Sequence, residues 1–355
     1  MSTFGRLYRG ETRIDFVGNR RRGFTFSGVM VAIALISMLF AGFNFSVDFE
    51  GGTVIEVENP GGATISDVRG ALEGVGVTGA KVQLIGGGDG VRVQAEQLPV
   101  VEEDAAVAAI AAVAGVDPAD ASRETVSPTF GSQVAESALR ALIIFLIVVA
   151  VYISIRLEWK MAFAGMLALG HDLLFTAGIY SLSGFEVSPS TVIAILTILG
   201  YSLYDTVVVF DKVLENIQER GERHTISAIV NMSMNQVFMR SINTSLTSLL
   251  PIGSLLFVGS FLLGATTLRE FALALFIGVF VGTYSSIFVA SPVLARWKEK
   301  EERWQRVRRR VGRKGIEDEF AVTHGVAQSP ADSAEAITAT TGAAPRPPRK
   351  RRRKR

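Results

Sequence analysis

The chain has 355 residues, of which 48% are hydrophobic, and its 36 Lys and Arg against 34 Asp and Glu give a formal net charge of +2. It contains no cysteine, which excludes disulfides, zinc-thiolate sites and cysteine nucleophiles. The small net charge conceals an asymmetry, because 18 of the basic residues lie in residues 296–355, whereas residues 48–139 hold 15 acidic residues and 4 basic ones.

Charge-free stretches long enough to cross a bilayer, which takes roughly 20 mostly apolar residues, recur along the chain. The second of these stretches is the shortest, since Arg140 and Arg156 enclose only 15 residues, and it spans only if Arg140 snorkels to the boundary. We predict a polytopic α-helical membrane protein with six transmembrane helices, at residues 24–43, 137–155, 161–183, 189–210, 237–262 and 271–295.

The basic residues of the short loops predict the orientation of these helices, because Lys and Arg accumulate on the cytoplasmic side. The amino-terminal segment 1–23, the short loop 156–160 and the loop 211–236 are rich in Lys and Arg, whereas the loops between them are poor in both. Both termini are therefore expected in the cytoplasm, and the first span reads as an uncleaved anchor, because no small-residue cleavage site is evident near its end.

Residues 44–136 are expected outside the cytoplasm as a domain without disulfides. Strand-like and helix-like patterns follow one another over 53–127 in the order βαββαβ, and the glycines at 86–88 suit a hairpin between the two middle strands. Pro99 and Gly115 suit the start and the end of the second helix. We predict an α+β ferredoxin-like domain that contacts a partner or moves as a lever, because no nucleophile, base and orienting group gather in it.

Asp205 is the one charge between Thr191 and Phe210, inside the fourth predicted span. An ionisable group within a span is unfavourable by about 2.5–3.5 kcal/mol on insertion scales, so it suggests a function. Asp172 is a second such group, in the middle of the third span, and His171 precedes it. Because adjacent helical residues point about 100° apart, we expect the two side chains not to point toward the same place. We expect His171 to make a packed polar contact.

Several strings of residues then match one known family. NFSVDFEGG at 44–52 resembles the D-F-x-G-G signature that follows the first span in the SecD/SecF family, accessory membrane subunits of the bacterial Sec machinery. GYSLYDTVVVFDKVLENIQE at 200–219 is similar to the fourth-span pattern of the SecF branch, and residues 231–252 and 278–293 resemble its fifth and sixth spans. The ordered set covers most of residues 14–297 and favours SecF over SecD.

The resemblance implies half of a resistance-nodulation-division type transporter in the bacterial plasma membrane. It implies association with SecD and the SecYEG channel, with SecA and YajC as further partners, and use of proton motive force to assist preprotein export. The family motif residues are carried over as Asp48, Phe49, Gly51, Gly52, Gly200, Tyr201, Ser202 and Asp211. Glu50 and Tyr204 depart from the usual residues, and Tyr204 puts the hydrogen bonding beside Asp205 in doubt.

Asp205 is our first candidate for a proton-binding group, because a carboxyl can load and unload a proton as a cation approaches and retreats. Arg240 is the expected cation, since it begins the next charge-free stretch at a similar depth. The resemblance places both residues, and Thr244, in the proton-conducting region, and Asp172 is a further candidate for the relay. The structural alternatives are a permanent Asp205–Arg240 ion pair and a Thr244 hydroxyl bonded to its own helix.

Three classes of function remain open: a proton-coupled export subunit, a small-molecule or lipid exporter of the same superfamily, and a passive scaffold for a membrane partner. An independent exporter is expected to carry two six-span halves, whereas this chain has one. No phosphate-binding loop of the form G-x-x-x-x-G-K-[ST] occurs, so we predict no ATP hydrolysis, no catalytic site and no cofactor or metal.

The carboxyl-terminal segment 296–355 lies outside the resemblance. Its first part places Trp297, Trp304, Val307 and Val311 near one helical face, which predicts a basic helix along anionic lipid. Residues 321–348 have the composition of a disordered segment. The final RKRRRKR predicts weak binding to anionic lipid or ribosomal RNA, with no role in DNA binding.

Overall fold

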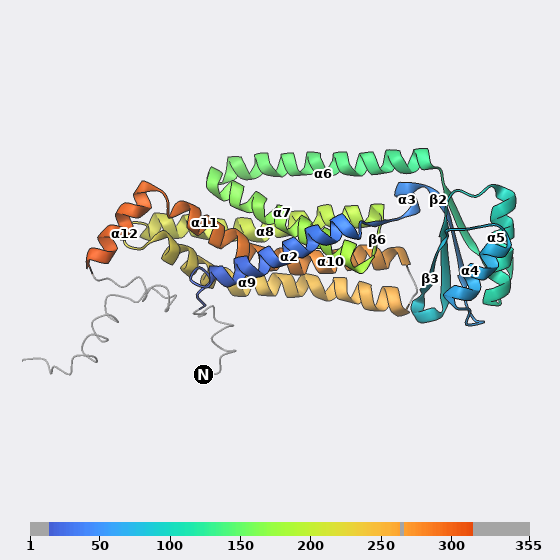
Figure 1. Ribbon diagram of the computed structural model, residues 1–355. Coiled ribbons are helices and arrows are strands. Elements are labelled where there is room, and N and C mark those ends of the chain that lie inside the picture. Colours follow the sequence, from blue (N-terminus) through green and yellow to red (C-terminus); the bar gives the residue numbers. More distant parts are fainter. Residues whose placement is uncertain (1–13, 263–265, 315–355) are drawn as a thin grey trace, which may run out of the picture.

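The molecule is elongated, with a bundle of long helices at one end and a small sheet with two helices at the other (Figure 1). This computed structural model describes residues 14–262 and 266–314. The long helices are α2 (Arg20–Phe40), α6 (Pro128–Arg156), α7 (Trp159–Ser183), α8 (Pro189–Arg220), α9 (Ile226–Ser254) and α10 (Thr266–Ser285). The π-helical segments η3 (Leu255–Leu262) and η4 (Ser286–Ala290) continue α9 and α10, and α11 (Ser291–Lys298) and α12 (Glu302–Lys314) follow.

Six helices of the described chain are long and apolar enough to cross a membrane, which confirms the predicted six-helix membrane protein. Local sequence sets several of their ends. Ser188 caps α8 through a capping box with Thr191, and Pro189 occupies the first turn, where no backbone donor is needed. Gly184 ends α7 at a φ of 69°, a left-handed conformation that glycine adopts without strain.

The helices of the bundle differ in how far they are buried. Most of the apolar part of α10 is buried, whereas α2 and α6 leave most of theirs exposed to the surroundings of the bundle. Two glycines of α10 allow it to approach α8 closely, because a Cβ added at Gly278 would lie 2.2 Å from Ile198 and one at Gly282 would lie 2.8 Å from Ser202. The backbone of α10 therefore packs directly against side chains of α8.

The sheet domain has the predicted order of strands and helices. Its strands are β2 (Gly52–Glu58), β3 (Lys81–Ile85), β4 (Gly90–Ala95) and β5 (Ser122–Val126), and its helices are α4 (Ile65–Gly74) and α5 (Val100–Ala114), with short 3₁₀ turns at η1 (Gly86–Gly88) and η2 (Pro118–Asp120). The strands pair antiparallel in the order β3-β4-β2-β5, the arrangement of a split βαβ fold.

Helices α4 and α5 cover the face of the sheet that points away from the bundle (Figure 1). The core between them is apolar, with Ile55, Leu72, Val91 and Ile110 almost completely buried. Because side chains alternate along a strand, the opposite face carries the polar residues, and it faces the membrane helices. Glu56 and Arg92, which are opposite each other in the β2–β4 register, lie on this face.

The domain is attached to the bundle through short polar segments. Strand β1 (Asn44–Phe45) pairs in parallel with β6 (Glu186–Val187), and α3 (Val47–Glu50) leads into β2. Gly51 has a φ of 79°, and a Cβ there would lie 2.5 Å from the Cα of Pro128 at the start of α6. A Cβ at Gly52 would lie 2.4 Å from the carbonyl oxygen of Ala95. The two glycines therefore permit a crossing that other residues would block.

Three helices, α6, α8 and α9, extend beyond the predicted spans. The segment 211–236 was expected as a loop, but α8 runs to Arg220 and α9 begins at Ile226. Val213 and Ile217 are buried at helical spacing, so the apolar stripe of α8 continues past the membrane region. Similarly, α6 begins at Pro128 and takes up residues that were assigned to the external domain.

The expectation for the basic helix after the last span needs correction. The Trp304, Val307 and Val311 side chains of α12 are buried against the bundle, and the ring of Trp297 packs on Trp159 and Phe163. The apolar face of α12 is thus occupied by protein and is not available to lipid. The expected disordered stretch 321–348, the final basic run and residues 1–13 lie outside the described residues.

Candidate functional site

Asp205 lies in the middle of α8 with 6% of its surface exposed. The hydroxyl of Ser241 on α9 donates a hydrogen bond of 2.7 Å to its Oδ1 atom. Its Oδ2 atom has no hydrogen-bond partner within the described part of the chain. A buried carboxyl with one oxygen left over can accept a proton there without breaking an existing bond.

Arg240 does not form an ion pair with Asp205 in this structure, the arrangement that was the structural alternative to a movable cation. Its Nη2 atom donates a hydrogen bond of 2.8 Å to the Tyr204 hydroxyl, and its guanidinium lies 5.9 Å from the centre of the Tyr204 ring. None of the ion pairs among the described residues joins Arg240 to Asp205. The residue at 204, where the sequence departs from the family pattern, is therefore the one that holds the arginine.

Hydroxyl groups continue the site from Asp205 through α9 toward α10. Ser245 donates to the carbonyl oxygen of Ser241 at 2.7 Å, and its hydroxyl lies 2.6 Å from that of Thr283. Thr244 donates to the carbonyl oxygens of Arg240 and Ser241 of its own helix, at 2.9 and 3.0 Å. Thr244 therefore lies beside the site with its hydroxyl bonded to the backbone.

Asp172 forms a second buried polar group between α7 and α8, with 1% of its surface exposed. Ser202 donates to its Oδ2 atom at 2.5 Å, and Nδ1 of His171 lies 3.2 Å from its Oδ1 atom. The two adjacent side chains thus meet, although their directions on an ideal helix suggested otherwise. The Ser286 hydroxyl lies 2.8 Å from that of Thr206, and it donates to the Ser202 carbonyl oxygen at 3.4 Å.

The other motif residues lie apart from these buried carboxylates. Asp48 accepts a hydrogen bond from Ser46 at the end of the bundle nearest the sheet domain, and Asp211 pairs with Arg156 at 3.4 Å on an exposed part of α8. The Tyr201 hydroxyl is buried without a hydrogen-bond partner in the described chain. Gly200 is exposed, with open space where a Cβ would stand. Phe49 contacts Phe45 edge to face beside the two motif glycines.

Sequence reasoning missed the hydroxyl groups that lie around these two sites. Ser241, Ser245, Thr283, Ser286 and Thr206 were not singled out. The spacing of Ser241 and Ser245 puts them on one helix face, which was a readable signal, but serine on apolar helices usually bonds its own backbone. Among the described residues, no group of three His, Asp or Glu side chains could hold a metal ion.

A polar stripe runs along the exposed surface of α8 and α9, from the predicted fourth span to the start of the predicted fifth span and into it. Exposed positions follow one another at helical spacing on each helix: Thr197, Gly200 and Tyr204 on α8, and Gln236, Arg240, Asn243 and Thr247 on α9. Polar side chains, an arginine above all, are unfavourable against lipid tails. The stripe therefore has the character of a surface that another membrane protein covers.

Two family models match the chain. "Protein export membrane protein SecD/SecF, C-terminal" matches residues 106–300, and "SecD/SecF GG Motif" matches residues 36–58. The protein translocase subunit SecF of Mycobacterium tuberculosis is 41% identical over 325 residues, which cover 87% of this chain and 73% of that protein. The chain belongs to the SecF family. The SecF subunit of Streptomyces coelicolor is 37% identical to this chain, and the match covers 95% of this chain and 93% of that protein.

One solved structure is similar to this SecF-family chain in both fold and sequence. The crystal structure of SecDF from Thermus thermophilus, described as a translocon-associated membrane protein, has a TM-score of 0.73 and 35% identity. The match covers 82% of this chain and 39% of that one, so the relative joins a SecF-like part to a longer remainder in one polypeptide. Asp172, Asp205 and Arg240 all lie inside the matched SecD/SecF region.

Proposed function

We propose that this SecF-family chain is the proton-coupled half of a SecD/SecF pair that promotes preprotein export through the SecYEG channel. The observation that carries the proposal is the Asp205 carboxyl, which is buried within a span, holds one hydrogen bond and has no partner for its second oxygen within the described part of the chain. Such a group is unfavourable in a membrane unless it serves a function, and proton uptake is the function that an unpaired oxygen allows.

Arg240 supplies the movable charge of the proposed cycle. In the described state it is bonded to the exposed hydroxyl of Tyr204, the residue before Asp205 on α8, and not to the carboxylate. A guanidinium that swings between Tyr204 and Asp205 would favour the neutral carboxyl in one position and the carboxylate in the other. A transmembrane potential supplies about 2.3 kcal/mol per charge per 100 mV, enough to bias two such states.

Asp172 and the hydroxyl chains are the proposed remainder of the proton path. The Asp205 carboxyl accepts a hydrogen bond from the Ser241 hydroxyl and Asp172 accepts one from the Ser202 hydroxyl, whereas Ser245 and Ser286 donate to the backbone carbonyl oxygens of Ser241 and Ser202. A hydroxyl group can both donate and accept, but a backbone carbonyl cannot relay a proton, so Ser245 and Ser286 extend the path only if they turn toward the Ser241 and Ser202 hydroxyls. Thr244 belongs to this path only if its hydroxyl leaves the backbone carbonyls that it now contacts.

SecD is the proposed occupant of the polar stripe on α8 and α9. The stripe carries Tyr204 and Arg240, so a partner that covers it completes the site and shields both groups from lipid. The fused SecDF relative supports this pairing, because there the SecF-like part is continuous with a longer polypeptide. By the family resemblance, SecA, YajC and translocating preproteins are the other partners, in the bacterial plasma membrane with both chain termini cytoplasmic and the sheet domain outside.

Export into inverted membrane vesicles with an imposed proton gradient tests the proposal. Asp205→Asn and Arg240→Met are each expected to abolish the part of export that responds to the gradient, while the ATP-driven part stays. Glu215→Gln is the matched control, because Glu215 is an exposed carboxylate on the same helix, paired with Lys212. A gradient response that survives Asp205→Asn would leave the chain as a passive scaffold, and loss of export of a small molecule alone would favour an exporter.

A further inference from the structure

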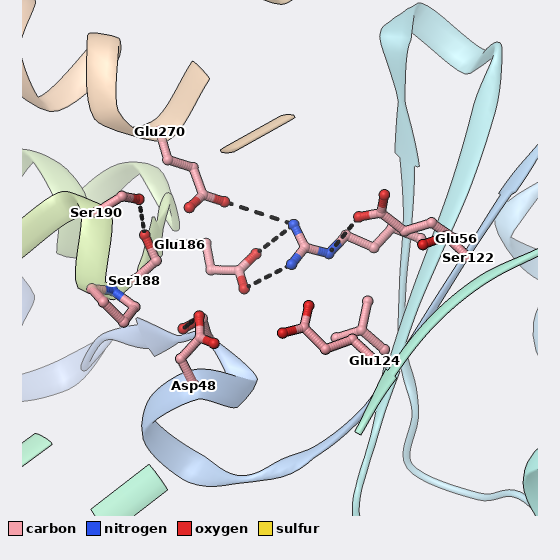
Figure 2. Close-up of a pocket in the computed structure, with 12 residues that line it drawn as sticks. Asp48, Glu56, Ser122, Glu124, Glu186, Ser188, Ser190 and Glu270 are labelled. Atoms are coloured by element: carbon pink, nitrogen blue, oxygen red, sulfur yellow. Dashed lines mark hydrogen bonds and ion pairs between the residues drawn. The ribbon is translucent and has the colours of Figure 1, made fainter. Parts of the chain in front are cut away.

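A cavity of about 530 Å³ separates the polar face of the sheet from the outer ends of the membrane helices. The sheet contributes Glu56, Arg92 and Glu124 to its lining, and the bundle side contributes Glu186 and Glu270 (Figure 2). The proposed export function does not use this part of the molecule.

Arg92 joins the two sides of this cavity. Its Nε atom lies 3.2 Å from Glu56 on the neighbouring strand, and its Nη1 atom lies 3.2 Å from Glu186 on β6 and 3.7 Å from Glu270 on α10. Its Nη2 atom also donates to Glu186 at 3.3 Å. Figure 2 shows the guanidinium between these carboxylates, with one on the sheet side and two on the bundle side. A planar guanidinium suits such a bridge, because its donors point in fixed directions.

Few other contacts hold the sheet against the bundle. The apolar cores of the two parts are separate clusters, and a small apolar cluster at the junction consists of Val47, Val54 and Val126. Other polar contacts, from Gln94 to the Phe45 carbonyl oxygen and from Lys81 to Asn44 and Glu50, lie on exposed side chains. Among the charged side chains in these described contacts from the sheet, that of Arg92, with 17% exposed, is therefore the most buried.

The junction carries more negative than positive charge. Besides its three partners, Arg92 shares the cavity with Asp48 on α3 and Glu124 on β5, and the nearby cations are Lys81 on β3 and Arg269 on α10. Burial raises the pKa of Glu186 above 4.5, Asp48 and Glu56 add to the rise, and Arg92 and Lys81 oppose it. Because five carboxylates share the single Arg92 guanidinium in this cavity, protonation of Glu186 relieves repulsion between the sheet side and the bundle side, and this relief is lost as the pH rises through the raised pKa.

We propose that Arg92 clamps the sheet domain to the outer ends of the membrane helices, and that proton uptake by the carboxylates around it tightens the clamp. The domain then docks when the outer side is acidic and loosens when these carboxylates are charged. This inference goes beyond the proposed export role, and its test does not require export.

The absence of cysteine from the chain makes a distance measurement clean. Spin labels are placed on the full chain in lipid nanodiscs through Arg69→Cys on α4 and Leu182→Cys on α7, both at exposed positions. Double electron–electron resonance then reports the distance distribution between sheet domain and bundle at about pH 5 and about pH 8. The wild-type distribution is expected to be narrow at the lower pH and broader at the higher one.

Two variants are expected to act in opposite directions. Glu186→Gln, which mimics the protonated side chain, is expected to keep the distribution narrow at both values of pH, and Arg92→Gln to broaden it at both. The undocked fraction changes about tenfold for each unit by which the pKa is shifted. Arg123→Gln is the matched control, because this arginine of strand β5 pairs with Glu103 and Asp104 inside the domain.

The proposal fails on either of two results. If Arg92→Gln leaves the distribution as narrow as in the wild type at both values of pH, Arg92 is not the clamp. If Glu186→Gln broadens it as Arg92→Gln does, the ion pair itself holds the domain and proton uptake does not tighten it. A tightening in Glu186→Gln cannot arise from a fold defect, so that variant keeps the test decisive.

Discussion

The sheet domain and the helix bundle bury polar groups in different ways. The core of the sheet domain is apolar, and its charged pairs, such as Arg123 with Asp104, lie at the surface. The bundle instead places Asp172 and Asp205 in its interior, each held by a serine of a neighbouring helix. The contrast indicates that the first region is arranged for stability, whereas the second retains groups that can change their state.

The largest effect is expected from a cavity in the sheet domain. Ile110 of α5 is completely buried, so Ile110→Ala should destabilise the domain by about 2–5 kcal/mol. Hydrogen exchange of strands β2 and β4 in the full chain measures the loss. Val101→Ala, at an 80% exposed position of the same helix, serves as the control and should change protection little. Equal effects of the two substitutions would mean that this core does not stabilise the domain.

A smaller effect is expected where a buried charge loses its donor. Ser202→Ala removes the 2.5 Å hydrogen bond to Asp172 and should lower the free energy of unfolding by about 1–3 kcal/mol. Thermal unfolding of the chain in detergent provides the measurement. Thr197→Ala is the control, because it removes an exposed hydroxyl that is bonded to its own helix. Its effect on the free energy of unfolding should stay within about 0.5 kcal/mol. If Ser202→Ala is as mild as its control, Asp172 does not depend on this serine.

The connection between the two regions should respond to a single methyl group. Gly51→Ala forces a left-handed residue, which is unfavourable by about 1–2 kcal/mol, and also brings a Cβ within 2.5 Å of Pro128. Gly62→Ala has a similar φ of 67° but open space around it, so it reports the backbone strain alone. Proteolysis at the junction should be faster in the first variant than in the second, and equal rates would argue against the close approach.

The smallest effect concerns the first turn of α4. Thr64 caps this helix, and its hydrogen bonds lower the pKa of Asp67 below 3.8. Because the pKa of Asp67 is lower in the folded helix than in the unfolded chain, its ionised carboxylate stabilises the helix at a pH above 3.8. This stabilisation is lost as the pH falls through the lowered pKa. Helix α4 should therefore fray in strong acid, seen as loss of amide protection in its first turn by NMR, and Thr64→Ala should remove this pH dependence. A first turn that frays alike with and without Thr64 would exclude the cap.

The sequence was sufficient for the parts of the fold that local patterns determine. Charge-free lengths predicted the six spans, and the glycines around residue 87 together with Pro99 and Gly115 predicted the connections of the sheet domain. The carboxyl end of α8 was harder to predict than its start at Pro189, because its buried stripe at Val213 and Ile217 continues among charged residues that suggested a loop.

Only those residues of the site were predictable whose side-chain chemistry is unusual for a membrane span. A lone aspartate such as Asp205 stands out in an apolar span, but its donor Ser241 does not, because the donor depends on how two helices are rotated against each other. The direction of Arg240 could not be predicted, since a long side chain reaches several partners from one backbone position. Arg92 was noted only as one of few basic residues, because its partners come from elements about 40, 90 and 180 residues away along the chain.

Infrared difference spectroscopy of the chain with its SecD partner in membranes tests the central claim most directly. When a proton gradient is switched on, the account predicts a change in the carbonyl stretch of a protonated carboxyl that is absent in Asp205→Asn and present in Glu215→Gln. A spectrum without this change, or one that Asp205→Asn leaves intact, would show that the buried aspartate keeps one ionisation state, which contradicts the proposed coupling.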